Sequence, residues 1–110
     1  MTEKKIGKIK VASFGFGGYD DAMMGLSLTF GSDKEGWGVS DFKGTWANRS
    51  EFAKWTEEDQ RKAFADAVIL LRDTLTAAKK KHVDQLIGVP VEVEFDNLTI
   101  KSWRILEEVL

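Results

Sequence analysis

Two of the four arginines in this sequence stand close to a tryptophan. Arg49 comes three residues after Trp46, and Arg104 directly follows Trp103. A guanidinium can donate two parallel hydrogen bonds to a phosphate, and an aromatic ring can stack on a base. The two residue types together therefore suit a phosphate-bearing ligand that also carries a planar base. A surface salt bridge is the commoner role of an exposed arginine and stays the alternative for Arg49 and Arg104.

The segment GFGGYDD, residues 15–21, is the second place that could contact such a ligand. Its glycines would let backbone amides approach a ligand, while Phe14, Phe16 and Tyr19 could stack on a base. The segment lacks the lysine and hydroxyl that complete a phosphate-binding loop. It is predicted to be a turn, and whether it also contacts a ligand stays open. Asn97, in a later Asp-Asn pair, is a turn residue first and a base-reading side chain second.

The sequence contains no cysteine and a single histidine, His82. Disulfides, thiolate nucleophiles, thiolate metal sites, histidine triads and histidine metal clusters are thereby excluded. Asp20 and Asp21 are adjacent in a glycine turn, where neighbouring carboxylates usually point apart, so we interpret them as turn residues. We expect a protein that is not an enzyme and that has no catalytic residue, metal or cofactor. Cleavage of a phosphodiester by an acidic pair with a metal is the enzymatic alternative.

Length and charge restrict the kind of protein further. A chain of 110 residues can enclose one core, so we expect a single domain over residues 1–110. The formal net charge is −2 with both signs spread along the chain, which gives no long-range field to attract duplex nucleic acid or an anionic membrane. The sequence has no run of about 18 apolar residues that would predict a membrane span. These features are typical of a soluble, cytoplasmic protein.

Alternating apolar residues predict strands in both terminal parts of the chain. Apolar positions alternate partly from Ile6 to Phe16 and strictly from Met24 to Phe30. A glycine-interrupted strand follows from Trp37 to Trp46. Residues 91–95 and 98–106 predict a closing hairpin around the Asp-Asn turn.

Between these strands the sequence predicts one long helix. Thr56 and the acids after it are typical of a helix start, and the helix should run from Glu57 to about Lys80. Its apolar residues recur at spacings of three and four, which predicts one buried face made of Phe64, Ala67, Val68, Leu71, Leu75 and Ala78. We therefore expect an α+β fold in which an antiparallel sheet, three N-terminal strands plus a C-terminal hairpin, packs against one long amphipathic helix.

The chain has four tryptophans, more than so small a core requires. Some of them should lie at the surface, in a pocket or in an oligomer interface, because tryptophan is enriched where one edge of the ring stays polar. On the strand from Trp37 to Trp46, Gly38, Ser40 and Gly44 should share a face with Phe42 and Trp46. That face could be covered by a helix, a partner or a ligand.

The stretches FGFGGYDDAMMGLSLTF, GWGVSDFKGTW, KWTEEDQ and the terminal GVPVEVEF with SWRILEEVL lie along most of the chain. Together they resemble the phage anti-Thoeris sponge family, Thoeris anti-defence protein one. The resemblance implies a protein that binds and sequesters a cyclic ADP-ribose isomer, made by a bacterial TIR-domain enzyme, without cleaving it. It also implies a homo-oligomer, dimer or hexamer, because some members are thought to hold cyclic trinucleotides in separate sites formed when dimers assemble into a hexamer.

The family's sites use aromatic stacking with arginine and asparagine contacts. On chemical grounds the candidate ligand-binding residues of this chain are Phe14, Phe16, Tyr19, Arg49, Asn97, Trp103 and Arg104. The expected partner is a small cyclic nucleotide signal in the cytoplasm of an infected bacterium. The alternative function is that of a small phage protein that binds a host or phage protein through a tryptophan-rich sheet face.

Overall fold

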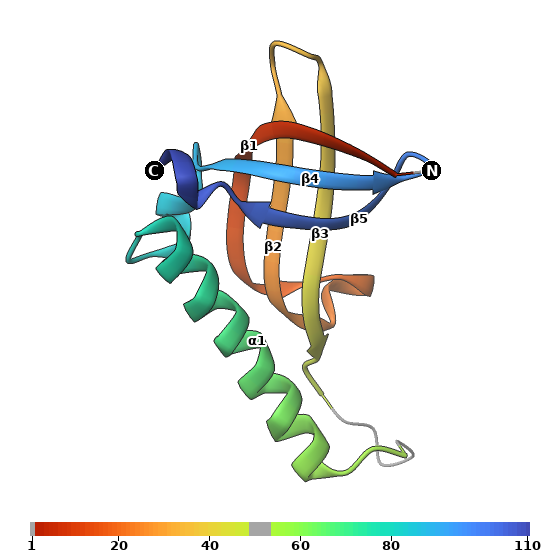
Figure 1. Ribbon diagram of the computed structural model, residues 1–110. Helices are drawn as coiled ribbons and strands as arrows, with labels where there is room; N and C mark the ends of the chain where they lie inside the picture. The colour runs from red at the N-terminus through yellow and green to blue at the C-terminus, as the bar shows by residue number, and fades with distance from the viewer. Residues whose placement is uncertain (1, 49–53) are drawn as a thin grey trace.

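The computed structural model describes residues 2–48 and 54–110 of the chain (Figure 1). In chain order the elements are β1 (Thr2–Gly17), η1 (Tyr19–Asp21), β2 (Met23–Ser32), β3 (Trp37–Trp46), α1 (Glu57–Ala78), η2 (Val83–Leu86), β4 (Pro90–Asp96), β5 (Thr99–Ile105) and η3 (Glu107–Val109). The predicted α+β fold, three N-terminal strands and a C-terminal hairpin in one antiparallel sheet with one long helix, is confirmed. Within these ranges, no helix is long and apolar enough to cross a membrane.

β1 is the longest strand and takes part in both halves of the sheet. The strand order is β3-β2-β1-β4-β5, and every pairing is antiparallel. Residues 8–17 of β1 pair with β2, whereas residues 2–8 pair with β4. A bulge between Ile9 and Val11 lies where β1 changes partner, and bulges bend strands. As a result β4 and β5 cross β2 and β3 instead of continuing in the same plane (Figure 1).

The core lies between the crossing halves of this open sheet. Aromatic rings join the two halves: the Phe30 and Trp103 ring centroids are 5.3 Å apart, and those of Trp37 and Phe95 are 5.6 Å apart. The largest fully buried side chains are Phe30, Ile9, Leu26, Leu28, Leu86, Val91 and Val93. The alternation that predicted β2 is therefore the alternation between this core and the outer face of the sheet.

α1 begins where the sequence predicts. The Thr56 hydroxyl accepts a hydrogen bond from the Asp59 N–H at 3.1 Å, and the Asp59 carboxylate accepts one from the Thr56 N–H at 2.9 Å. This capping box satisfies two backbone donors that the helix itself cannot. The helix ends at Ala78 instead of about Lys80, because Lys79 adopts a left-handed φ of 59° that stops it.

α1 covers the core face of β2 and β3, beside the β4–β5 hairpin. Its buried residues are small: Ala67, Thr74 and Ala78. The predicted burial of Val68 is wrong, since this side chain is 56% exposed. The contact face of α1 passes through Ala67, and the next residue points further around the helix, away from the sheet.

Candidate functional site

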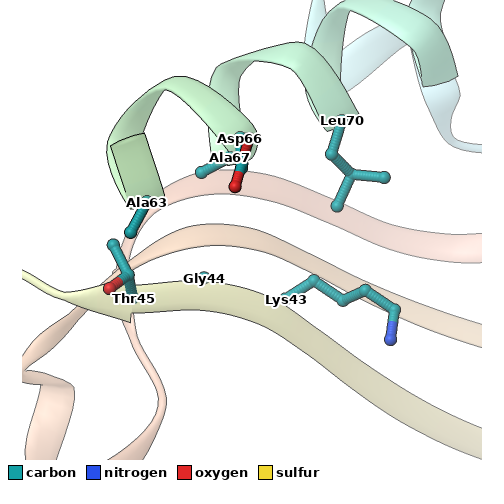
Figure 2. Close-up of a pocket in the computed structure, with 7 residues that line it drawn as sticks. All are labelled: Lys43, Gly44, Thr45, Ala63, Asp66, Ala67 and Leu70. Carbon is teal, nitrogen blue, oxygen red and sulfur yellow. The ribbon is translucent and has the colours of Figure 1, made fainter. Parts of the chain in front are cut away.

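A groove separates α1 from the edge strand β5, and β3 forms its floor. It consists of two hollows of about 280 and 400 Å³ that share the lining residues Lys43 and Leu70. The first is lined by Lys43, Gly44, Thr45, Ala63, Asp66, Ala67 and Leu70 (Figure 2). The second adds Asp73, Thr74 and Ala77 of α1, residues 101–105 of β5, and Glu107. The larger hollow falls in the size range of small-molecule sites, about 300–1,000 Å³.

Small side chains on facing elements create this groove. Ala63 and Ala67 stand one helical turn apart on α1 and face the strand that carries Gly44 (Figure 2). Neither alanine extends far enough to fill the space between the helix and β3, and Gly44 lines the hollow with its backbone. Leu70, one turn further along, points toward the strand that carries Lys43 (Figure 2). Both Leu70 and Lys43 line both hollows.

Trp103 is the fixed aromatic wall of the groove. Its indole Nε1 donates a hydrogen bond to Asp41 Oδ2 at 3.0 Å, and this bond joins β5 to β3 across the core face. The Asp41 side chain is only 19% exposed, and its carboxylate also lies 3.5 Å from Lys43 Nζ. Because the ring also packs on Phe30, the indole is held from two sides before any ligand arrives. An aromatic surface held in this way loses little conformational entropy on binding.

Charges of both signs border the groove. Lys43 and Lys101 stand on the strand side, while Asp66 and Asp73 stand on the helix side. Lys101 has no ion pair within the described residues, whereas Asp73 accepts from Arg72 at 2.9 Å. The groove can therefore offer ammonium groups to phosphates and carboxylates to hydroxyl or amino groups of one ligand.

The side chains of Trp103 and Arg104 lie on opposite faces of β5, and a ligand contact of either residue stays a prediction. Trp103 packs into the core face, whereas the Arg104 guanidinium donates to Glu92 at 3.2 Å and to both Glu108 oxygens at 3.0 and 3.1 Å. The hydrogen bonds that Arg104 donates to Glu108, and then to Glu92, raise the pKa of Arg104. The salt-bridge alternative thus describes Arg104 in this structure, although the residue also borders the groove.

The aromatic residues around the first turn do not reach the groove. Phe14 packs against the core, whereas Phe16 and Tyr19 are 72% and 73% exposed. Tyr19 meets Trp46 edge to face at a centroid distance of 6.5 Å. Tyr19 and Trp46 thus form an exposed aromatic pair.

The first turn itself is an unusual one. Gly18 has φ 69° and ψ −151°, and Asp20 and Asp21 each have a φ of 52°. The Ala22 N–H closes the turn by donating to the Tyr19 carbonyl at 3.0 Å. The prediction that GFGGYDD reverses the chain is confirmed, and a ligand contact of this segment stays a prediction.

Asn97 and Arg49 complete the set of candidates. Asn97 has a left-handed φ of 51° in the β4–β5 turn, as its turn role predicts. It lines a separate hollow of about 270 Å³ with Thr2, Glu3, Phe95 and Leu98, at the opposite end of β1 from Tyr19. Arg49 lies outside the described residues. Of the predicted residues that the structure describes, Trp103 and Arg104 are the ones that line the groove.

No family model, curated protein or solved structure matches the chain.

Several groove residues were missed by the sequence analysis. Lys43 and Lys101 line the groove, and Asp41 holds Trp103; the three lie on strands, and only the fold gives them these roles. The pair Ala63 and Ala67 did carry a signal, because two small residues one turn apart leave a helix face open to a close neighbour. Within the described residues no cluster of three or more acidic or histidine side chains could hold a metal ion.

Proposed function

We propose that this protein binds a small cyclic nucleotide in the groove between α1, β3 and β5 and releases it unchanged. The observation that carries the proposal is the preformed hollow of about 400 Å³ with the fixed Trp103 indole in its wall. Lys43 and Lys101 would meet the phosphates, while Asp66 and Asp73 would accept from ribose hydroxyls or the base amino group. Holding a ligand in this way requires no nucleophile and no general base.

The biological role follows the resemblance stated above. The ligand would be a cyclic ADP-ribose isomer, with cyclic trinucleotides as further ligands, and the protein would act in the cytoplasm of an infected bacterium. By keeping the free concentration of the signal low, it would leave the defence effector inactive. A sponge must bind tightly, and the held indole and the groove walls favour tight binding because little needs to be ordered when the ligand enters.

A thermal-shift series tests this function. A ligand at 100 times its Kd adds about 2.7 kcal/mol to the free energy of unfolding, which should raise the midpoint by roughly 10 °C. We expect such a rise with one cyclic ADP-ribose isomer in a panel that also holds cyclic di- and trinucleotides. Lys101→Gln should reduce the rise, whereas Lys62→Gln, on the exposed side of α1, should not.

Recovery of the compound separates binding from catalysis. After heat denaturation of the complex, chromatography should return the ligand intact and in stoichiometric amount. A flat panel would contradict the binding function, and a new product in the supernatant would replace the sponge with the enzymatic alternative.

We also propose that the protein forms a homo-oligomer, a dimer or a hexamer. The radius of gyration is 15.1 Å, whereas a compact chain of this length has one of about 13 Å. α1 leaves two large apolar side chains in solvent, Val68 at 56% and Ile69 at 42% exposure. An elongated protomer with an apolar helix face favours association with another copy.

Light scattering at micromolar concentration measures this directly. For the wild type we expect a mass of at least two chains, each of 12.4 kDa. The double substitution Val68→Glu and Ile69→Glu should shift the mass toward that of a single chain. Both positions are exposed in the protomer, so its helix should persist, which circular dichroism would verify. A wild-type mass of 12.4 kDa alone would contradict the oligomer.

The second candidate function, binding of a protein partner, is favoured by one observation. Trp46 is 45% exposed and lies beside the exposed Tyr19. Phe42 and Trp46 lie on the same face of β3, the face that is turned away from α1. The tryptophans do not all lie on that outer face, however, since Trp37 and Trp103 pack against the core. A stable complex with a host protein, lost in Trp46→Ala, together with a flat ligand panel would favour this candidate.

A further inference from the structure

A second hollow lies at the bend of β1 and shares no lining residue with the groove. Its volume is about 340 Å³. It is lined by Ile6, Gly7, Lys8 and Lys10 of β1, by residues 31–34 at the end of β2, and by Pro90. We refer to it as the corner pocket.

The change of partner along β1 produces the corner pocket. Lys8 is the one position of β1 that stands opposite both a β2 residue, Gly31, and a β4 residue, Pro90. Beyond it the β2–β3 hairpin continues without β1 at its side. Gly7 keeps the junction tight, since a Cβ there would lie 2.6 Å from the Gly31 carbonyl oxygen and 2.7 Å from the Trp37 ring. The pocket therefore has backbone instead of side chains at its base.

The charges of the corner pocket differ from those of the groove. Three lysines line it, Lys8, Lys10 and Lys34, against the single carboxylate of Asp33. Lys10 Nζ is 2.6 Å from Asp33 Oδ2, so that pair is satisfied. Lys8 and Lys34 have no ion pair within the described residues. In a chain of net charge −2, this concave surface thus carries two uncompensated positive charges.

The electrostatic environment of Asp33 supports this picture. Its hydrogen bond and charge interaction with Lys10 lower its pKa, and the charge of Lys8 adds to the same effect. The Lys8 ammonium therefore acts on the Asp33 carboxylate through its charge, although the two groups form no ion pair.

We propose that the corner pocket binds the phosphates of a small phosphorylated molecule, with Lys8 and Lys34 as the ammonium donors. The volume exceeds what a single phosphate fills, so a pyrophosphate or a sugar phosphate fits the space better than one orthophosphate ion. Ile6, 53% exposed, and Pro90 give this ligand an apolar wall next to the charged one. The site is independent of the groove and of the function proposed for it.

Titration calorimetry with inorganic pyrophosphate at low ionic strength tests the assignment. We expect saturable binding to the full chain, weakened at least tenfold in the double substitution Lys8→Gln and Lys34→Gln. Asp33→Asn should act in the opposite direction and tighten binding. It removes the one carboxylate among the residues that line the pocket, and it releases Lys10 from its ion pair. These side chains are exposed, so circular dichroism and the melting midpoint should stay unchanged.

A matched control separates this site from a general loss of positive charge. Lys62→Gln removes one positive charge from α1, outside the groove and outside the corner pocket. It should bind pyrophosphate as the wild type does. Equal binding by the Lys8 and Lys34 variant, weaker binding by Asp33→Asn, or no binding to the wild type would each overturn the proposal. A single-stranded oligonucleotide that binds in place of pyrophosphate, with the same lysine dependence, would overturn the small-molecule assignment.

Discussion

Replacing Gly44 with alanine is expected to lower the free energy of unfolding by about 3 kcal/mol, near the upper end of overpacking costs. A Cβ at this position would lie 2.7 Å from the Met24 carbonyl carbon and 2.8 Å from the Gly25 Cα. Both atoms belong to the backbone of β2, so no side chain can rotate away and the two strands must separate. Urea denaturation should measure the loss, and the melting midpoint should fall by roughly 10–20 °C.

Gly15 provides the matched control, because it stands in the same row of the sheet. Gly15 pairs with Gly25, and Gly25 pairs with Gly44. An added Cβ at Gly15 meets nothing within 4 Å. Gly15→Ala should therefore leave stability within about 0.5 kcal/mol of the wild type. Equal stability of the two variants would contradict the close approach of β2 and β3.

Replacing Trp103 with alanine is expected to cost about 3–5 kcal/mol, because the substitution removes a large ring that packs against Phe30 in the core. It also removes the only hydrogen bond from β5 to Asp41 among the described residues. The Asp41 carboxylate, 19% exposed, would keep Lys43 as a neighbour at 3.5 Å but lose its closer partner. Equilibrium unfolding in urea would measure the cost.

Two further variants divide this cost between packing and hydrogen bonding. Trp103→Phe keeps an aromatic ring on Phe30 and loses the N–H donor, so its cost should be about 1–2 kcal/mol. Trp46→Ala, at a 45% exposed position away from the core, should cost less than Trp103→Ala. If Trp46→Ala lowered the free energy of unfolding more than Trp103→Ala, this would contradict the conclusion that Trp103 joins β5 to β3 and to the core.

Local patterns in the sequence accounted for the elements of the fold. Strict alternation from Met24 to Phe30 identified β2, because Leu26, Leu28 and Phe30 are buried between the sheet halves and the intervening Ser27 and Thr29 are not. Thr56 located the start of α1, since a capping box is formed by residues three positions apart. Such features depend on neighbouring residues only, which is why they could be predicted.

The candidate site was predicted less well. Trp103 and Arg104 were both singled out and both border the groove, but their side chains point to opposite faces of β5, as alternation along a strand requires. Lys43 and Asp41 could not have been found, because their role depends on contact with residues about 60 positions away.

The sequence by itself determined the type and order of the elements, the start of the helix and the turns at residues 15–21 and at Asn97. The tertiary structure alone decided that β1 bends at its bulge and shares its length between β2 and β4. That bend lays the β4–β5 hairpin beside α1 and opens the groove between them, and it gathers Lys8, Lys10 and Lys34 at the corner. The physical reason is that alternation records which face of a strand is buried, but not which strand lies next to it or where it changes partner.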